Sequence, residues 1–223
     1  MLRWPVVLFD LDGTLADTVD LIVASYEHAL QEVLDARVPT PKIRTWIGRP
    51  LRAAVVEAFP DQADRIDDVV TAYRQWNLAH HDEMIEQVPG MVGLLEELIA
   101  GGARMGVVTS KMNRTAAHGL RAVGLDGQIR VLSGQEQTER HKPHPEPLLH
   151  AAHLLGADPG ECVYIGDATV DLQAAHTAGM ASIGVTWGAG RRDDLHDEGP
   201  VAVVDDVREL ASVLLPSSRT RGD

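Results

Sequence analysis

The stretch "VVLFDLDGTLADT", residues 6–18, places two carboxylates directly after a short apolar run. The run Val6–Phe9 is continuous and β-branched, which is typical of a strand covered on both faces of a parallel sheet. In an extended chain, residues i and i+2 point to the same side, so Asp10 and Asp12 can face one site. Two negative charges about 4 Å apart repel by roughly 4 kcal/mol in the dielectric near a protein surface. The pair therefore predicts a positively charged partner.

The composition limits the classes of protein to be considered. The chain has 223 residues, 44% hydrophobic and 24% charged, which is typical of one folded domain or a domain with an insertion. The net charge of −13 argues against a nucleic-acid partner. The single cysteine, Cys162, excludes an intrachain disulfide and favours a cytoplasmic location. No apolar run reaches about 18 residues and no signal-peptide pattern is present, so we expect no membrane association. No pattern specifies an oligomeric state.

Five further apolar runs end in polar residues and predict the remaining strands of the sheet. They are residues 103–110, 129–134, 162–167, 181–187 and 201–206. Helical patterns lie between them, at residues 91–102, 114–125, 146–156 and 170–179. A proline near the start or a glycine at the end marks the bounds of several of these helices. The alternation of strands and helices predicts an α/β fold with a Rossmann-like parallel sheet core.

Residues 17–87 interrupt this alternation, because they show helical patterns only. Apolar residues at helix spacing run from Leu21 to Leu34, and further helical patterns cover residues 51–59 and 65–84. We predict an all-helical cap, residues 17–87, inserted into a core made of residues 1–16 and 88–215. The two connections near residues 16 and 88 would then act as hinges. The polar tail, residues 216–223, is predicted to be disordered.

Chemically active side chains follow the predicted strands. In an open parallel sheet, ligands bind beyond the carboxyl ends of the strands. Thr109 and Ser110 end the second core strand with hydroxyls and free amides, which suit phosphate oxygens. Gly13 permits a tight turn directly after the two carboxylates, where it is predicted to contact substrate. Asp167 and Asp171 follow the strand at residues 162–167.

Several carboxylates at one edge of the sheet require a cation. Mg²⁺ prefers oxygen ligands and typically takes one or two carboxylates plus a substrate phosphate. Lys142, in the proline-rich segment "HKPHPEP", adds a compact positive charge that can hold phosphate. The chain has only three lysines against 17 arginines, and Lys111 and Lys142 are two of them. Lys111 either stands on the first turn of a helix or contacts the substrate, and we favour the first interpretation.

Four motifs now stand in order along the chain: "DLDGT", the Thr109–Ser110 strand end, Lys142 before "PHPEP", and "GDATVD". In these motifs the sequence resembles the haloacid-dehalogenase-like phosphohydrolases, over essentially its whole length. The resemblance implies that Asp10 is the nucleophile and forms an aspartyl-phosphate. It implies that Asp12 protonates the leaving oxygen and later activates water. Thr109 would bind the phosphoryl group, and Lys142 would balance its charge.

The resemblance also implies a metal site and a substrate class. Mg²⁺ would be held by Asp10, the backbone carbonyl of Asp12, and Asp167, while Asp171 would hold a metal-bound water or Lys142. A helical insertion directly after the first motif resembles the phosphoglycolate-phosphatase-like branch, so the expected substrate is a small phosphorylated metabolite, with phosphoglycolate as the default. In the cap segment "RTWIGRPLR", Arg49 could reach the leaving group of the substrate, or it could be a surface arginine.

Other functions on the same fold stay open at this point, together with pyrophosphate, sugar phosphates and nucleoside monophosphates as substrates. A sugar phosphomutase would need a cap histidine twelve residues after the nucleophile, where this chain has Ile22. A phosphonate hydrolase would need a cap lysine, and the cap has only Lys42. A non-catalytic phosphate-binding regulator would not carry a helical insertion of this size. We interpret the remaining candidate metal ligands, His141, His144, His150 and His153, as solvated histidines.

Overall fold

In the computed structural model, which describes residues 2–216, the six predicted strands form one parallel sheet in the order β5-β4-β1-β6-β7-β8. The strands are β1 (Val6–Phe9), β4 (Arg104–Val108), β5 (Val131–Ser133), β6 (Cys162–Gly166), β7 (Ala181–Val185) and β8 (Ala202–Val204). The α/β class and the parallel sheet are therefore confirmed. Because β1 pairs with β4 on one side and β6 on the other, Asp10 emerges from the centre of the sheet.

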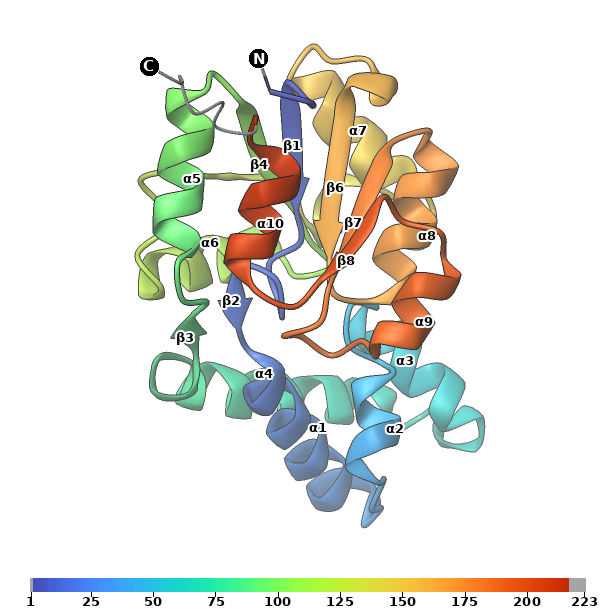
Figure 1. Ribbon diagram of the computed structural model, residues 1–223. Helices are drawn as coiled ribbons and strands as arrows, with labels where there is room; N and C mark the ends of the chain where they lie inside the picture. The colour runs from blue at the N-terminus through green and yellow to red at the C-terminus, as the bar shows by residue number, and fades with distance from the viewer. Residues whose placement is uncertain (1, 217–223) are drawn as a thin grey trace, which may run out of the picture.

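Helices cover both faces of the sheet (Figure 1). They are α5 (Met91–Ala100), α6 (Asn113–Ala122), α7 (Glu146–Leu154), α8 (Thr169–Ala178), α9 (Arg192–Asp197) and α10 (Val207–Leu214). Val7 and Phe9 of β1 belong to the apolar cluster under α5, α6 and α10, whereas Val6 and Leu8 belong to the cluster under α7 and α8. Burial on both faces explains why β1 is apolar at every position, without alternation.

The acidic stretch at residues 191–198 contains a helix that the sequence pattern did not predict. Most of its side chains are exposed, but Leu195 of α9 is fully buried against the sheet. A single apolar residue among charged ones carries too little periodicity to indicate a helix.

The cap consists of α1 (Val19–Leu34), α2 (Thr40–Arg44), α3 (Leu51–Ala58) and α4 (Ile66–Met84), with a short 3₁₀ turn at Pro60–Gln62. These helices lie beyond the end of the sheet to which the strands point (Figure 1). They enclose an apolar cluster of their own, in which Trp46 packs edge-to-face on Tyr26 with ring centroids 5.2 Å apart. The cap therefore has a separate hydrophobic core, placed directly over the carboxyl ends of the strands.

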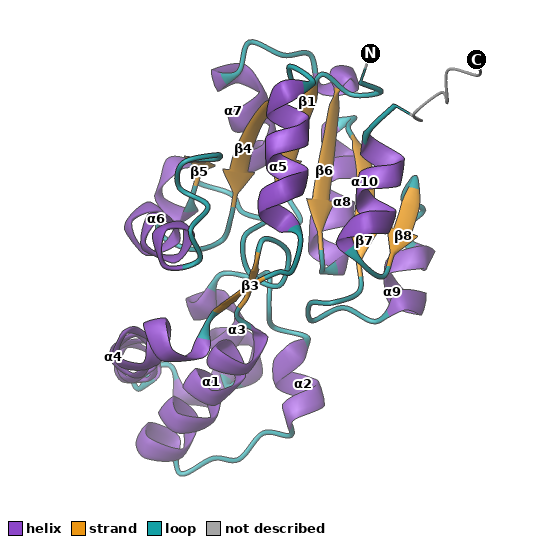
Figure 2. Cartoon of the chain, turned by 60° about the vertical axis from the view of Figure 1, so that its left-hand side comes forward, coloured by secondary structure: helices purple, strands orange, loops and turns teal. Residues whose placement is uncertain are grey.

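Two short strands join the cap to the core. β2 (Ala16–Asp17) pairs antiparallel with β3 (Glu86–Gln87), so the two connections lie side by side (Figure 2). This pair was not predicted, because two residues are too few for a strand pattern. It lies where the hinges were expected, and their movement stays a prediction.

None of the helices in residues 2–216 is long and apolar enough to cross a membrane. The predicted disordered tail, apart from Pro216, lies outside the described residues. The cytoplasmic location stays a prediction.

Candidate active site

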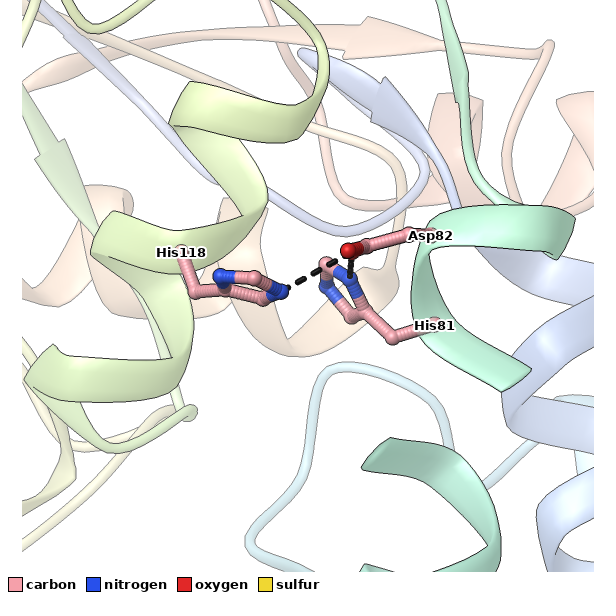
Figure 3. A group of neighbouring side chains, drawn as sticks. All are labelled: His81, Asp82 and His118. Atoms are coloured by element: carbon pink, nitrogen blue, oxygen red, sulfur yellow. Dashed lines mark hydrogen bonds and ion pairs between the residues drawn. The ribbon is translucent and has the colours of Figure 1, made fainter. Parts of the chain in front are cut away.

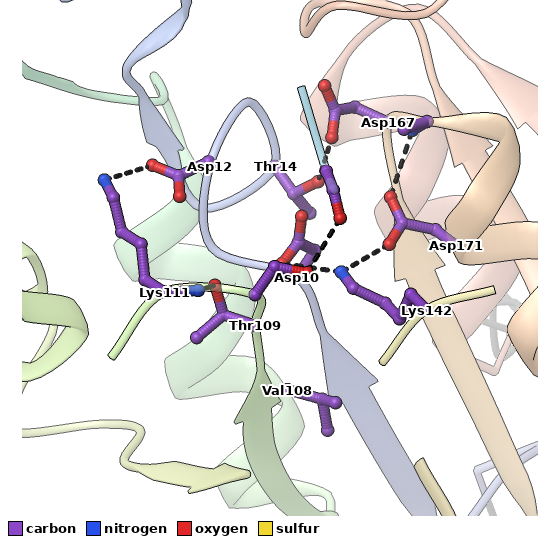
Figure 4. A network of polar contacts seen from close by, with 12 residues as sticks. Asp10, Asp12, Thr14, Val108, Thr109, Lys111, Lys142, Asp167 and Asp171 are labelled. Atoms are coloured by element: carbon purple, nitrogen blue, oxygen red, sulfur yellow. Dashed lines mark hydrogen bonds and ion pairs between the residues drawn. The ribbon is translucent and has the colours of Figure 1, made fainter. Parts of the chain in front are cut away.

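Three carboxylates from two strand ends meet at the centre of the sheet edge (Figure 4). Asp10 follows β1, and its backbone N–H donates to the carbonyl of Ile165 at 2.8 Å. Asp167 follows β6, and Asp171 lies in the first turn of α8. One oxygen of each carboxylate lies within 4.8 Å of the other two, and none of the three residues is more than 1% exposed. Residues that the sequence separates by over 150 positions thus form one buried acidic site.

Burial makes this site unfavourable for negative charge in the absence of a cation. Burial raises the pKa of Asp10 to about 7, although Lys142 beside it acts in the opposite direction. Burial, with the neighbouring charges of Asp171 and Asp10, raises the pKa of Asp167 well above its usual range. One lysine therefore does not compensate three buried carboxylates, and a further cation would stabilise their charged forms.

Lys142 lies in the middle of this acidic site. Its Nζ is 2.6 Å from Oδ1 of Asp171 and 3.1 Å from Oδ1 of Asp10. Burial alone would lower the pKa of Lys142, but Asp10 and Asp171 together raise it well above its usual range. Asp171 also accepts a hydrogen bond from the N–H of Ala168 at 3.0 Å. Of the two roles that the sequence left open for Asp171, the structure shows the contact with Lys142.

Tyr164 is a member of this network that the sequence analysis missed. Its hydroxyl donates to the carbonyl of Val108 at 2.8 Å and accepts from Nζ of Lys142 at 3.1 Å. The residue is fully buried in β6, within an apolar run that gives no signal for a polar role.

Asp12 has a lysine partner of its own. Nζ of Lys111 lies 2.5 Å from Oδ1 of Asp12, and the hydroxyl of Thr18 donates to the same oxygen at 2.7 Å. The expectation that Lys111 starts a helix was wrong, because α6 begins only at Asn113. The opening carboxylate pair is therefore stabilised by two different lysines, one for Asp10 and one for Asp12.

The predicted phosphate-binding hydroxyls lie at the end of β4. Thr109 is buried, and its hydroxyl accepts a hydrogen bond from the N–H of Lys111 at 3.2 Å. The hydroxyl of Ser110 donates instead to the carbonyl of Gly48 in the cap at 2.8 Å. Both residues line the cavity between core and cap, and Ser110 also connects the two.

Glycines allow the backbone to approach Asp167 closely. A Cβ on Gly13, whose φ is +72°, would lie 2.3 Å from Oδ2 of Asp167, and one on Gly188 would lie 2.2 Å from the same atom. The N–H of Ala189 donates to Oδ2 of Asp167 at 2.6 Å. The N–H of Gly190 donates to the backbone carbonyl of Asp167 at 3.0 Å. The loop 188–190 was not predicted to belong to the site, although its two glycines directly follow a strand. Gly13 positions Asp167 through its lack of a side chain.

A cavity of about 220 Å³ separates this edge of the core from the cap. The core side of its wall includes Asp10, Asp12, Thr109, Ser110 and Lys111. The cap side is mainly apolar and aromatic, and its polar residues are Arg49, Arg74, Asn77 and His81. Arg49 lines the cavity while its guanidinium pairs with the exposed carboxylate of Glu57. The structure therefore places Arg49 on the cap side of the cavity, opposite the carboxylates.

The donor set suits a cation that binds oxygen. Asp10 Oδ1 is buried and accepts no hydrogen bond within the described part of the chain, although Lys142 lies near it. Among the described residues, Asp10, Asp167 and Asp171 form one of two groups that could hold an ion, and all three offer only oxygen. Such a set fits Mg²⁺. His141, His144, His150 and His153 belong to neither group.

Comparisons with known proteins agree with this geometry. The sequence profile of the haloacid dehalogenase-like hydrolases matches residues 7–185. The pyrophosphatase PpaX of Anoxybacillus flavithermus is 33% identical over 96% of this chain and 98% of its own length. The crystal structure of a hydrolase from Pseudomonas syringae matches 94% of this chain and 99% of its own, with a TM-score of 0.85 and 26% identity. The crystal structure of a predicted phosphoglycolate phosphatase from Haemophilus somnus matches 96% of this chain and 99% of its own, with a TM-score of 0.81 and 27% identity.

Removing the hydroxyl of Tyr164 tests the network around Lys142. We expect Tyr164→Phe to lower the free energy of unfolding by about 1–3 kcal/mol, because it leaves the carbonyl of Val108 without its donor and Lys142 without one acceptor. Urea denaturation measures the loss. Tyr26→Phe, at a buried tyrosine of the cap, is the matched control for the substitution itself. A Tyr164→Phe protein as stable as the wild type would contradict the network.

Proposed function

Since the chain belongs to the haloacid dehalogenase-like hydrolases, we propose that it is a magnesium-dependent phosphatase acting on a small phosphorylated metabolite. The observation that carries the proposal is the placement of Asp10. Its carboxylate lies at the end of the central strand, on the wall of the cavity, beside Lys142 and within reach of two further carboxylates. A buried carboxylate with an open cavity in front of it and a cationic neighbour is suited to nucleophilic attack on a phosphoryl group.

The proposed reaction uses the two carboxylates of the first strand end in different roles. A carboxylate oxygen of Asp10 forms a bond to phosphorus while the bond from phosphorus to the leaving oxygen breaks, which gives an aspartyl-phosphate. Asp12 gives its proton to the leaving oxygen and then takes a proton from the water that hydrolyses the intermediate. Lys111 and Thr18 both contact Oδ1 of Asp12. We therefore assign the transferred proton to Oδ2.

The remaining residues bind and orient the phosphoryl group. The Thr109 hydroxyl lies on the cavity wall and is assigned to a phosphoryl oxygen. Mg²⁺ would be held by Asp10, Asp167 and the backbone carbonyl of Asp12, and it would supply positive charge to the carboxylates and to the phosphoryl oxygens. Lys142 holds Asp10 and Asp171 in position through its buried ammonium.

The substrate is proposed to carry a negative charge on its leaving group. Lys111 of the core and Arg49 and Arg74 of the cap line the cavity, so an anionic leaving group would meet three cations there. Phosphoglycolate is our default substrate, and the match to a predicted phosphoglycolate phosphatase supports it. Pyrophosphate is the second candidate, supported by the relative named as a pyrophosphatase. Phosphate release from each compound in the presence of Mg²⁺ distinguishes the two.

A phosphomutase or a phosphonate hydrolase receives less support from the residues around the cavity. Ile22, which stands where a phosphomutase would need a histidine, lies on the cavity wall as an apolar side chain. Lys42, the only cap lysine available to a phosphonate hydrolase, is exposed on α2 and is not among the residues that line the cavity. A phosphate-binding regulator would show no turnover, so the phosphate-release assay also tests for a regulator.

Replacing the proposed nucleophile should abolish turnover. Asp10→Asn keeps the shape of the side chain but removes the attacking charge, so we expect phosphate release to fall about a thousandfold or more. Circular dichroism should show an intact fold, because Asn has the shape of Asp and Asp171 still pairs with Lys142 at 2.6 Å. Asp20→Asn, at an exposed position of α1, makes the same chemical change and should leave turnover unaffected. Substantial turnover in Asp10→Asn would exclude it as the nucleophile.

Metal binding should stabilise the protein as well as activate it. Mg²⁺ compensates the buried carboxylates, so it should raise the melting temperature in a concentration-dependent way, and a chelator should abolish both the rise and the turnover. Ca²⁺ should support turnover poorly, because its larger and looser coordination displaces the phosphoryl group. In Asp167→Asn the thermal shift should largely disappear. Full activity in excess chelator would refute the metal requirement.

Arg49 should matter only for substrates with an anionic leaving group. A charge-assisted pair between Arg49 and a substrate carboxylate contributes roughly 1.5–3 kcal/mol, so Arg49→Ala should lower kcat/KM for phosphoglycolate about 10- to 150-fold. The same variant should barely change kcat/KM for p-nitrophenyl phosphate. Arg52→Ala, at an exposed arginine in the first turn of α3 that pairs with Asp67, is the control. Equal losses on both substrates would assign Arg49 a structural role, and no loss would make it a surface arginine.

A further inference from the structure

His81, Asp82 and His118 form a second cluster of potential metal ligands, at the contact between cap and core (Figure 3). His81 and Asp82 lie near the end of α4 in the cap, and His118 lies on α6 in the core. Oδ1 of Asp82 is 2.7 Å from Nδ1 of His81 and 2.9 Å from Nε2 of His118. One carboxylate oxygen is thus shared by two imidazoles that come from different parts of the fold.

The chemistry of these ligands differs from that of the carboxylate site. Two imidazole nitrogens and one carboxylate oxygen suit a borderline ion such as Zn²⁺, whereas Mg²⁺ prefers oxygen alone. Three protein ligands leave one position of a tetrahedral ion free for water. We propose that His81, Asp82 and His118 bind one Zn²⁺ ion.

The cluster needs only a small rearrangement to accept the ion. Zinc bonds of about 2.0–2.2 Å place neighbouring ligand atoms about 3.3 Å apart, slightly farther than the two contacts of Asp82. The Asp82 side chain is 66% exposed and that of His118 is 37% exposed, so both can move and solvent can reach them. His81 is only 1% exposed and holds its place in the wall of the cavity. The site therefore has one fixed ligand and two adjustable ones.

One nearby charge opposes a cation at this cluster. Lys111 lines the same cavity as His81. Its ammonium is nevertheless paired with Asp12, which offsets much of its positive charge. Asp82 supplies a full negative charge within the cluster itself, so the balance at the ligands favours binding of a divalent ion.

A bound ion would connect the cap with the core. His81 and Asp82 move with α4, whereas His118 moves with α6, so coordination by all three holds these helices together. Opening of the cap would require loss of at least one metal bond. If the cap must open for product release, Zn²⁺ should slow turnover. That last consequence rests on the proposed function, whereas zinc binding does not.

Zinc binding is tested by equilibrium dialysis against Zn²⁺ in an excess of Mg²⁺, which occupies the carboxylate site. We expect one Zn²⁺ per wild-type chain, and a Kd at least about tenfold weaker in His118→Ala and in Asp82→Asn. His153→Ala removes an exposed histidine of α7 outside the cluster and should leave the Kd unchanged. Thermal melts without zinc verify that each variant is folded. We expect both variants to fold, because the side chains of His118 and Asp82 are exposed.

Hydrogen exchange and turnover test whether bound Zn²⁺ connects the cap with the core, beyond binding to the cluster. Zinc should slow amide exchange in the last turn of α4 in the wild type but not in His118→Ala, and it should inhibit wild-type turnover more than that of His118→Ala. Absence of zinc binding to the wild type at micromolar concentration would overturn the proposal, and so would an unchanged Kd in His118→Ala. Zinc binding in a protein without phosphatase activity would uphold the site and refute the proposed function alone.

Discussion

The ammonium of Lys142, buried between two carboxylates, is the interaction on which the rest of the site depends. It joins segments far apart in the chain, because Asp10 follows β1, Asp171 begins α8 and Tyr164 lies in β6. A charge buried in this way is tolerated only if its partners are present, and removal of one partner typically costs several kcal/mol. Lys142 therefore fixes the end of β1 relative to β6 and to α8, the helix that follows β6. This arrangement sets the position of the nucleophile Asp10.

A second constraint is the lack of space around Asp167. The loop after β1 and the loop after β7 both approach this carboxylate so closely that a Cβ on Gly13, Gly188 or Gly190 would overlap with it or with its carbonyl. The same backbone supplies the N–H of Ala189 to Oδ2. The lack of a side chain on these glycines thus lets backbone atoms approach and orient the carboxylate.

The strands, the core helices flanked by proline and glycine, and the residues at the strand ends could be predicted from the sequence, because each depends on a local pattern or on the shared edge of a parallel sheet. The partners of those residues could not. Lys111 meets Asp12 across 99 positions, and Tyr164 is one more apolar-looking residue of a buried run. His81 and His118 come together only when α4 of the cap rests on α6 of the core. Such contacts depend on tertiary placement, which no spacing along the chain encodes.

Cap and core meet through both apolar and polar contacts: Leu21 of α1 belongs to the apolar cluster of the core, and several hydrogen bonds also cross between the two. Ser110 donates to the carbonyl of Gly48, His118 contacts Asp82, and Arg44 of α2 donates to the carbonyl of Gly188 at 2.7 Å. Water can replace each of these bonds when the cap moves away, so each adds only about 0.5–1.5 kcal/mol to the closed arrangement. A ligand that fills the cavity and contacts both walls adds interactions that exist only when the cap is closed. Gly188, which accepts the hydrogen bond from Arg44, also packs on Asp167, so a single loop contacts both the cap and the carboxylate site.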